Sequence, residues 1–168
     1  MADPVLRPLL FLDVDGPLIP FGATSQPYPT YEPSGDDSNP LLRRIDPAHG
    51  PRLAALGCEL VWATTWMNDA NDSISPRLGL PELQVVIWPE AGEYDGQDER
   101  AGLHWKTRAL VDWAAGRSFV WVDDELTEVD RAWVEFSHRG RALLHAVDPR
   151  IGLSELDYFA LRRWLDLG

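Results

Sequence analysis

Four carboxylates follow two short apolar runs of this 168-residue chain. Asp13 and Asp15 follow the run LLFL, and Asp123 and Asp124 follow the run FVWV. If both runs are strands of one parallel sheet, their carboxyl ends meet at the same edge and bring the four acids together. Carboxylates this close repel one another unless a cation neutralises them. Oxygen ligands with no His or Cys beside them suit a hard cation, and Mg²⁺ is the expected cofactor.

Two hydroxyls and one amine extend this group. Thr64 and Thr65 follow a third apolar run, LVWA, and could donate hydrogen bonds to an anion. Lys106 is the only lysine, since the other 14 of the 15 basic residues are arginine. Chance composition would also leave a single lysine, so the neighbouring motifs decide its meaning. Together with those motifs, the compact ammonium group of Lys106 indicates a position where a guanidinium would not fit.

Five short apolar runs predict strands at residues 8–14, 59–63, 84–88, 118–122 and 141–147. The runs are continuously apolar, as expected of strands whose two faces are both covered. Segments of helical periodicity alternate with them, which is typical of an α/β protein. We therefore expect a Rossmann-like three-layer sandwich with a central parallel sheet of about five strands.

Apolar positions three or four residues apart predict which helix faces are buried. A helix is expected after Thr127, which with Asp130 resembles a capping box. Its expected buried side consists of Val129, Ala132, Trp133 and Phe136. A last helix is expected to begin at Ser154, with a buried side that consists of Leu156, Phe159, Ala160 and Trp164. The acidic run over residues 93–99 is interpreted as a solvated loop rather than as a second metal site.

The segment from Pro17 to Pro40 contains six of the 14 prolines of the chain. Neither a helical nor a strand periodicity fits this segment, so a long loop or flap is expected over residues 17–40. Loops of this length inside compact domains are usually functional or disordered. No internal repeat and no linker divides the sequence, and we expect residues 1–168 to form one domain.

Four motifs occur along the chain in the order Asp13-x-Asp15, a strand-terminal threonine, Lys106 and a strand-terminal Asp-Asp pair. This order resembles that of the haloacid dehalogenase (HAD)-like superfamily, and in particular its Mg²⁺-dependent phosphatases with an aspartate nucleophile. The resemblance extends from Pro8 to about Val147. It implies hydrolysis of a phosphomonoester through an aspartyl phosphate on Asp13. The intervals between the motifs leave no room for an independent cap domain, so a capless member with an open site is expected.

The resemblance also implies a role for each acid. Asp13 would attack the phosphoryl group and bind the metal through its side chain, and Asp15 would bind the metal through its backbone carbonyl. Asp15 would also act as the general acid and then as the general base. Asp123 would complete the metal shell, and Asp124 would bind directly or through a water molecule.

The other motif residues would hold the phosphate. Either Thr64 or Thr65 is the phosphate ligand; Thr64 is preferred because it directly follows the apolar run, and Thr65 would contribute its amide. Lys106 would stabilise negative charge on the nucleophile and the phosphate together. Gly16 would let the chain turn sharply beside the phosphate. Pro17 stands where many family phosphatases carry Thr or Val, and it would stiffen the exit of this turn.

Composition restricts the partners. The chain has 27 acidic and 15 basic residues and a formal net charge of −12, which disfavours duplex nucleic acid. No apolar stretch reaches the roughly 18 residues of a membrane-spanning helix, and no signal peptide pattern is present. We therefore expect a cytoplasmic protein with no membrane partner. The implied partner is a phosphorylated substrate of unspecified size, and the sequence indicates no oligomeric state.

Two alternatives stay open beside a general phosphomonoester hydrolase. A phosphatase of nucleic-acid ends, similar to the polynucleotide 3′-phosphatases, would need a local basic patch such as Arg43, Arg44 and Arg52 to offset the net charge. A non-catalytic HAD-fold protein that binds a phospholigand or a partner would have no use for an acid/base group at Asp15.

Overall fold

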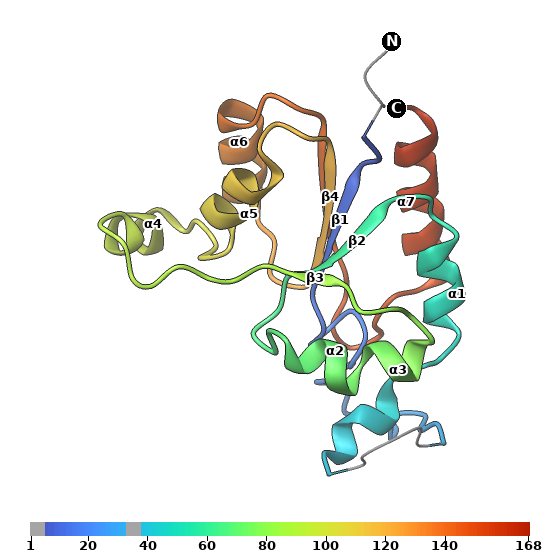
Figure 1. The fold of residues 1–168 in the computed structure, drawn as a ribbon. Helices are drawn as coiled ribbons and strands as arrows, with labels where there is room; N and C mark the ends of the chain where they lie inside the picture. The colour runs from blue at the N-terminus through green and yellow to red at the C-terminus, as the bar shows by residue number, and fades with distance from the viewer. Residues whose placement is uncertain (1–5, 33–37) are drawn as a thin grey trace.

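The structure, a computed structural model, describes residues 6–32 and 38–168 and has a five-stranded sheet at its centre (Figure 1). The strands are β1 (Leu9–Leu12), β2 (Glu59–Trp62), β3 (Gln84–Val85), β4 (Phe119–Asp123) and β5 (Ala142–Ala146). They pair in the order β3-β2-β1-β4-β5, and every pair is parallel. The predicted strands and the predicted three-layer α/β fold are confirmed.

Helices cover both faces of the sheet. On one face lie α1 (His49–Ala54) and α7 (Glu155–Asp166), and on the other lie α5 (Thr107–Ala114) and α6 (Glu128–Ser137) (Figure 1). Three short helices lie toward the edge where the strands end: η1 (Pro40–Arg44), α2 (Asp69–Ser73) and α3 (Ser75–Leu78). The remaining helix, α4 (Asp95–Ala101), lies beside α5 and away from the sheet. In the described residues, no helix combines the length and the apolar character needed to cross a bilayer.

The central strands β1 and β4 are buried along their whole length. Leu10 and Leu12 pack into the core beneath α1 and α7, whereas Leu9 and Phe11 pack into the core beneath α5 and α6. Successive side chains of a strand point to opposite faces, so a strand covered on both sides must be apolar at every position. Burial of both faces explains why these strands read as continuous apolar runs.

The segment that follows β1 turns tightly before it enters the predicted proline-rich loop. The amide of Gly16 donates to the carbonyl of Ile19 at 3.0 Å, which closes the turn. Residues 20–32 form neither a helix nor a strand. Residues 33–37 of the predicted loop lie outside the described residues, and η1 begins at Pro40.

The buried faces of two predicted helices are wrong in part, although the helices are present and Trp133 and Trp164 pack against the core as predicted. On α6, Val129 and Phe136 are exposed, and the buried residues are Asp130 and Val134. On α7, Leu156 and Phe159 are exposed, and Tyr158 and Leu161 face the core. In α6 the carboxylate of Asp130 turns inward, and a pattern of apolar residues alone does not predict this. In α7 the buried side contains Tyr158 and Leu161, an apolar pair on another face than the predicted one. The predicted acidic loop is also wrong over part of its length, because residues 95–101 form α4.

Buried Asp130 connects α6 to the segment that leads into α5. One of its carboxylate oxygens accepts hydrogen bonds from the backbone amide of His104 (2.7 Å) and the hydroxyl of Thr107 (2.9 Å). The other accepts from the amide and the hydroxyl of Thr127, both at 2.9 Å, and so closes the predicted capping box. Since Lys106 lies between His104 and Thr107, Asp130 holds the backbone that carries this lysine.

We predict that Asp130→Asn lowers the free energy of unfolding by about 1–3 kcal/mol. Each oxygen of Asp130 accepts one backbone N–H, so a carboxamide must turn its NH₂ group toward one of these donors. Urea denaturation followed by circular dichroism measures the loss. The matched change Glu128→Gln, at an exposed position of the same helix, should alter stability by less than about 0.5 kcal/mol. Equal stability of the two variants would contradict the role given to Asp130.

Candidate active site

Three carboxylates meet at the carboxyl edge of the sheet. Asp13, Asp123 and Asp124 each offer an oxygen atom, and these atoms lie within 4.8 Å of one another. The pairing of Leu12 with Val122 in β1 and β4 sets Asp13 and Asp123 at the same level of the sheet. Asp13 is 8% exposed and Asp123 is 1% exposed, so both acids are withdrawn from water. The register of the two central strands therefore creates this cluster.

Lys106 is the cation of the cluster. Its ammonium nitrogen lies 2.8 Å from Asp123 Oδ2, 3.2 Å from Asp13 Oδ1 and 2.9 Å from the carbonyl oxygen of Ala63. An ammonium group has three N–H donors, and here each one has an oxygen acceptor. The rings of Trp88 and Trp105 enclose it from outside, with centroids 5.8 and 5.5 Å from the nitrogen. A planar guanidinium would not match these three converging acceptors, which accounts for a lysine at this position.

One lysine does not neutralise three carboxylates, and their pKa values reflect this excess. Burial raises the pKa of Asp13 to about 7, and the charge of Asp123 adds to the rise. Burial and Asp123 also raise the pKa of Asp124 to about 6. Burial opposes ionisation of Asp123 as well, but the charge of Lys106 and its hydrogen bond outweigh burial and lower the pKa of that carboxyl.

The donor set fits Mg²⁺. All three side chains of the cluster offer oxygen, the element that a hard divalent cation prefers. With every carboxylate ionised, the cluster together with Lys106 carries two uncompensated negative charges, which a dication would balance. Asp13, Asp123 and Asp124 are therefore the residues that would hold the metal, and they are three of the four predicted ligands.

The side chain of Asp15, the fourth predicted ligand, is not part of the three-carboxylate cluster. Its Oδ2 accepts a hydrogen bond of 3.0 Å from the indole nitrogen of Trp66. Its carboxylate still lines the same small cavity as Asp13 and Lys106. Binding of a metal by its backbone carbonyl stays a prediction.

Gly16 supports the cluster through its lack of a side chain. Its φ angle is +99°, in the region that favours glycine. A Cβ atom at this position would lie 2.8 Å from Cγ of Asp124. The close approach of the Gly16 backbone therefore sets the position of Asp124, and a contact of Gly16 with phosphate stays a prediction.

The two threonines have different surroundings. Thr64 is fully buried, and its hydroxyl accepts a hydrogen bond of 3.2 Å from the backbone amide of Trp66. Its carbonyl accepts a bond of 3.0 Å from the indole of Trp88. Thr65 is exposed and lines the cavity. The geometry therefore favours Thr65 for direct contact with a phosphate, in contrast to the preference for Thr64 drawn from the sequence.

A cavity of about 170 Å³ unites these groups. Of the residues singled out in the sequence, it is lined by Asp13, Asp15, Thr65, Lys106, Asp123 and Asp124, and it leaves out Thr64 and Gly16. Small-molecule sites usually measure roughly 300–1,000 Å³. This cavity therefore suits a phosphoryl group, and the remainder of a substrate would lie outside it.

Aromatic and imidazole groups that sequence reasoning did not assign to the site also border it. Phe21 and Trp105 line the cavity and are 43% and 54% exposed. Trp105 precedes α5, whose first residue is Thr107. His104 accepts a hydrogen bond of 3.1 Å on Nδ1 from the amide of Lys106, and burial lowers its pKa, so it supports the lysine as a neutral ring. No signal in the sequence distinguishes these aromatic residues from core residues.

The family described as "HAD domain in Swiss Army Knife RNA repair proteins" matches residues 9–158 of the chain. The match begins with the first residue of β1 and ends within α7, so it includes all five strands. It also includes every residue that lines the small cavity. No curated protein and no solved structure matches the sequence.

We predict that Mg²⁺ binds more tightly as the pH rises from 5 to 8. Asp13 and Asp124, with pKa values of about 7 and about 6, must lose their protons before they bind a cation. The affinity should rise by up to about tenfold per pH unit for each proton released, and then level off. Isothermal titration calorimetry in buffers of different ionisation enthalpy measures both the affinity and the proton release.

The metal-free protein should respond to pH in the opposite direction. The folded pKa of Asp13 lies above its ordinary value of 3.8, so protonated Asp13 contributes stability that is fully present below pH 3.8. That contribution is lost as the pH rises through about 7. The variant Asp13→Asn lacks this group. Near pH 7, its Mg²⁺ affinity and its metal-free stability should therefore both become independent of pH. A wild-type Mg²⁺ affinity that is constant from pH 5 to 8 would contradict the pKa assignment.

Proposed function

The chain belongs to the family of HAD domains in Swiss Army Knife RNA repair proteins, and from this membership we propose that it hydrolyses phosphomonoesters with Asp13 as nucleophile. Membership of the HAD-like superfamily confirms the family expected from the sequence. The observation that carries the proposal is the surroundings of Asp13, which lies at the end of β1 against Lys106 and two further acids. A second acid, Asp15, lines the same cavity two residues later.

In the first step, a carboxylate oxygen of Asp13 attacks phosphorus, and the bond from phosphorus to the leaving oxygen breaks. Asp15 donates a proton to that oxygen, so the leaving group departs as an alcohol. The product on the enzyme is an aspartyl phosphate at Asp13. When bound, Mg²⁺ would neutralise negative charge shared by Asp13 and the phosphate, so that the two anions can approach.

In the second step, Asp15 takes a proton from a water molecule, whose oxygen attacks phosphorus. The bond between phosphorus and Asp13 then breaks, which releases inorganic phosphate and restores both carboxyl groups. Lys106 stabilises negative charge on Asp13 and on the transferred group throughout. Trp66 holds Asp15 by the hydrogen bond to Oδ2, which supports the orientation that both proton transfers need.

We further propose that the leaving group is the end of a nucleic-acid strand. The family is described for RNA repair proteins, which supports a substrate of this class. The small size of the cavity supports it as well, because a terminal phosphate could enter while the strand stays outside. A single-stranded end also avoids most of the repulsion that the net charge of −12 would impose on a long duplex.

Phosphate release from a panel of substrates tests the activity. The panel contains p-nitrophenyl phosphate, nucleotides, sugar phosphates, phosphopeptides and 3′-phosphorylated oligonucleotides, each with Mg²⁺ or with EDTA. We expect Mg²⁺-dependent release, with the 3′-phosphorylated oligonucleotides giving the highest kcat/KM. Asp13→Asn should lower kcat by at least about 10³-fold, as loss of an enzymatic nucleophile does. Asp15→Asn should lower it by about 10²- to 10⁴-fold.

Release that persists in Asp13→Asn would refute the proposed nucleophile. If no compound is hydrolysed faster by the wild type than by Asp13→Asn, the alternative of a non-catalytic phospholigand-binding domain is favoured.

The two threonines provide a matched pair of variants. Thr65→Val removes a hydroxyl that lines the cavity, and we expect KM for a phosphomonoester to rise by about 10- to 100-fold, the range for loss of a hydrogen bond to a charged group. Thr64→Val removes a buried hydroxyl and should chiefly lower the melting temperature. Steady-state kinetics and thermal denaturation of both variants separate the two roles. The reverse outcome would restore Thr64 as the phosphate ligand.

A further inference from the structure

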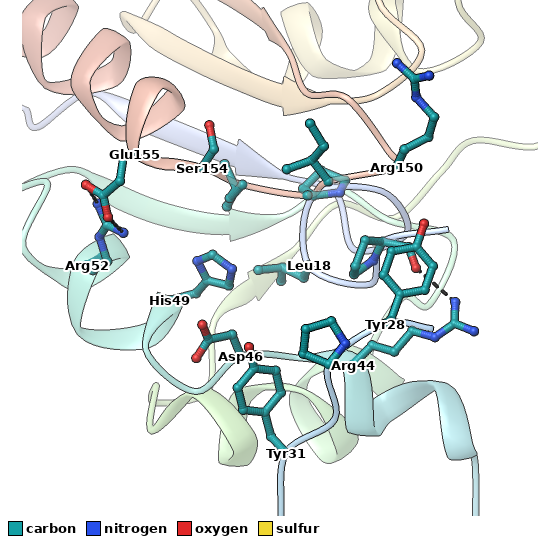
Figure 2. A pocket seen from close by; sticks show the side chains of 16 residues that line it. Leu18, Tyr28, Tyr31, Arg44, Asp46, His49, Arg52, Arg150, Ser154 and Glu155 are labelled. Carbon is teal, nitrogen blue, oxygen red and sulfur yellow. Dashed lines mark hydrogen bonds and ion pairs between the residues drawn. The ribbon is translucent and has the colours of Figure 1, made fainter. Parts of the chain in front are cut away.

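Figure 2 shows a second cavity, of about 420 Å³. Its walls come from three parts of the chain: residues 17–31, the segment from η1 into α1, and the segment that leads into α7. This volume is within the roughly 300–1,000 Å³ typical of sites for small organic groups. The cavity is large enough for a part of the substrate that the small cavity leaves outside.

One short segment of chain forms a wall of both cavities. Asp15 and Phe21 line the small cavity of the candidate active site. Between them, Pro17, Leu18 and Pro20 line the second cavity. The two cavities are therefore neighbours, with the turn after β1 between them.

Arg44 provides a cation for a phosphate at this second cavity. Its guanidinium lies 4.7 Å from the ring centroid of Tyr28 and donates one hydrogen bond of 2.9 Å to the carbonyl of Pro20. In the part of the chain that the structure describes, no carboxylate pairs with Arg44. The other two arginines of the cavity are paired, Arg52 with Glu155 and Arg150 with Asp148. Arg44 thus keeps several N–H donors for an anionic ligand.

Hydrogen-bonding groups lie deeper in the same cavity. Asp46 and His49 are neighbours on its wall (Figure 2). The hydroxyl of Tyr158 lies 2.8 Å from Nδ1 of His49 and can donate to this atom, which would leave the hydrogen of the ring on Nε2. The carboxylate of Asp46 accepts a bond of 2.9 Å from the amide of Ala48 and another from the hydroxyl of Tyr31, and with four lone-pair sites it retains acceptor capacity. A donor and an acceptor beside apolar and aromatic walls suit the edge and the faces of a nucleobase.

The opposite side of the active site repels phosphate groups. There a cavity of about 630 Å³ extends along α4 and α5. Its lining includes Glu90, Asp95, Glu99 and Glu125, and its single arginine, Arg108, is paired with Asp98. Phosphates avoid a surface of this charge, so a strand that leaves the active site is directed toward Arg44 instead.

We propose that the second cavity is a nucleotide pocket, which holds a nucleotide next to the phosphorylated end of the substrate strand. The base enters between the turn after β1 and the wall formed by Asp46 and His49, and a phosphate of the strand pairs with Arg44. The assignment of this ligand to the substrate strand rests on the proposed function.

Fluorescence anisotropy with a labelled single-stranded RNA oligonucleotide that ends in a 3′-hydroxyl tests the pocket without turnover. Arg44→Ala removes the cation, and Pro29→Trp fills the cavity without removing a charge. We expect each variant to raise the Kd for the oligonucleotide by about tenfold or more, the range for loss of a charge-assisted or stacking contact. The control Arg139→Ala removes an exposed arginine between α6 and β5 and should change Kd by less than twofold. Thermal denaturation verifies that each variant is folded.

Unchanged Kd values in both folded pocket variants would overturn the proposal. A second arm compares a trinucleotide with a nucleoside monophosphate as competitors. We expect the trinucleotide to bind at least tenfold more tightly, whereas equal affinities would assign the pocket to a free nucleotide and refute its link to the strand. Hydrolysis of p-nitrophenyl phosphate by the wild type tests the proposed function separately, because this compound needs only the small cavity.

Discussion

Three carboxylates share one buried ammonium group at the edge of the sheet, and the rest of the site depends on this imbalance. Lys106 has an oxygen for each of its three N–H donors, so it neutralises part of the charge and leaves the remainder on Asp13 and Asp124. Burial raises the pKa values of Asp13 and Asp124, the charge of Asp123 adds to the rise, and the oxygen donors of the cluster fit a dication. A phosphate, itself an anion, would approach these carboxylates more readily together with a cation.

Two kinds of structure hold this cluster. The parallel register of β1 and β4 places Asp13 beside Asp123, and apolar burial on both faces of these strands fixes that register. Hydrogen bonds of polar side chains position the rest. Asp130 fixes the backbone on both sides of Lys106, and Trp66 holds the side chain of Asp15. The sheet therefore sets where charges stand, while buried polar contacts set which way they point.

The sequence predicts the first kind of structure far better than the second. Continuous apolar runs predicted all five strands, and the acids that follow two of these runs predicted where the cluster would form. The inward face of α6 was not predictable from apolar spacing, because Asp130 turns inward and accepts hydrogen bonds there. On α7 two apolar stripes compete, and the buried one contains Tyr158 and Leu161. Thr64 and Thr65 follow β2 in a turn where Thr64 is buried and Thr65 lines the cavity, and the sequence does not distinguish these two neighbours. The hydrogen bond of Trp66 to Asp15 joins residues far apart in the chain, and no local sequence pattern predicts it.

The burial of Lys106 has a consequence for chemical modification. Lys106 is the only lysine of the sequence, and it is 4% exposed. The single lysine that acetylation, ubiquitination or a lysine-directed cross-linker could modify therefore lies inside the candidate active site. Two tryptophan rings cover it. Any lysine-directed regulation of this chain would have to open the site first, and a reagent that reached the amine would remove the charge on which the carboxylate cluster depends.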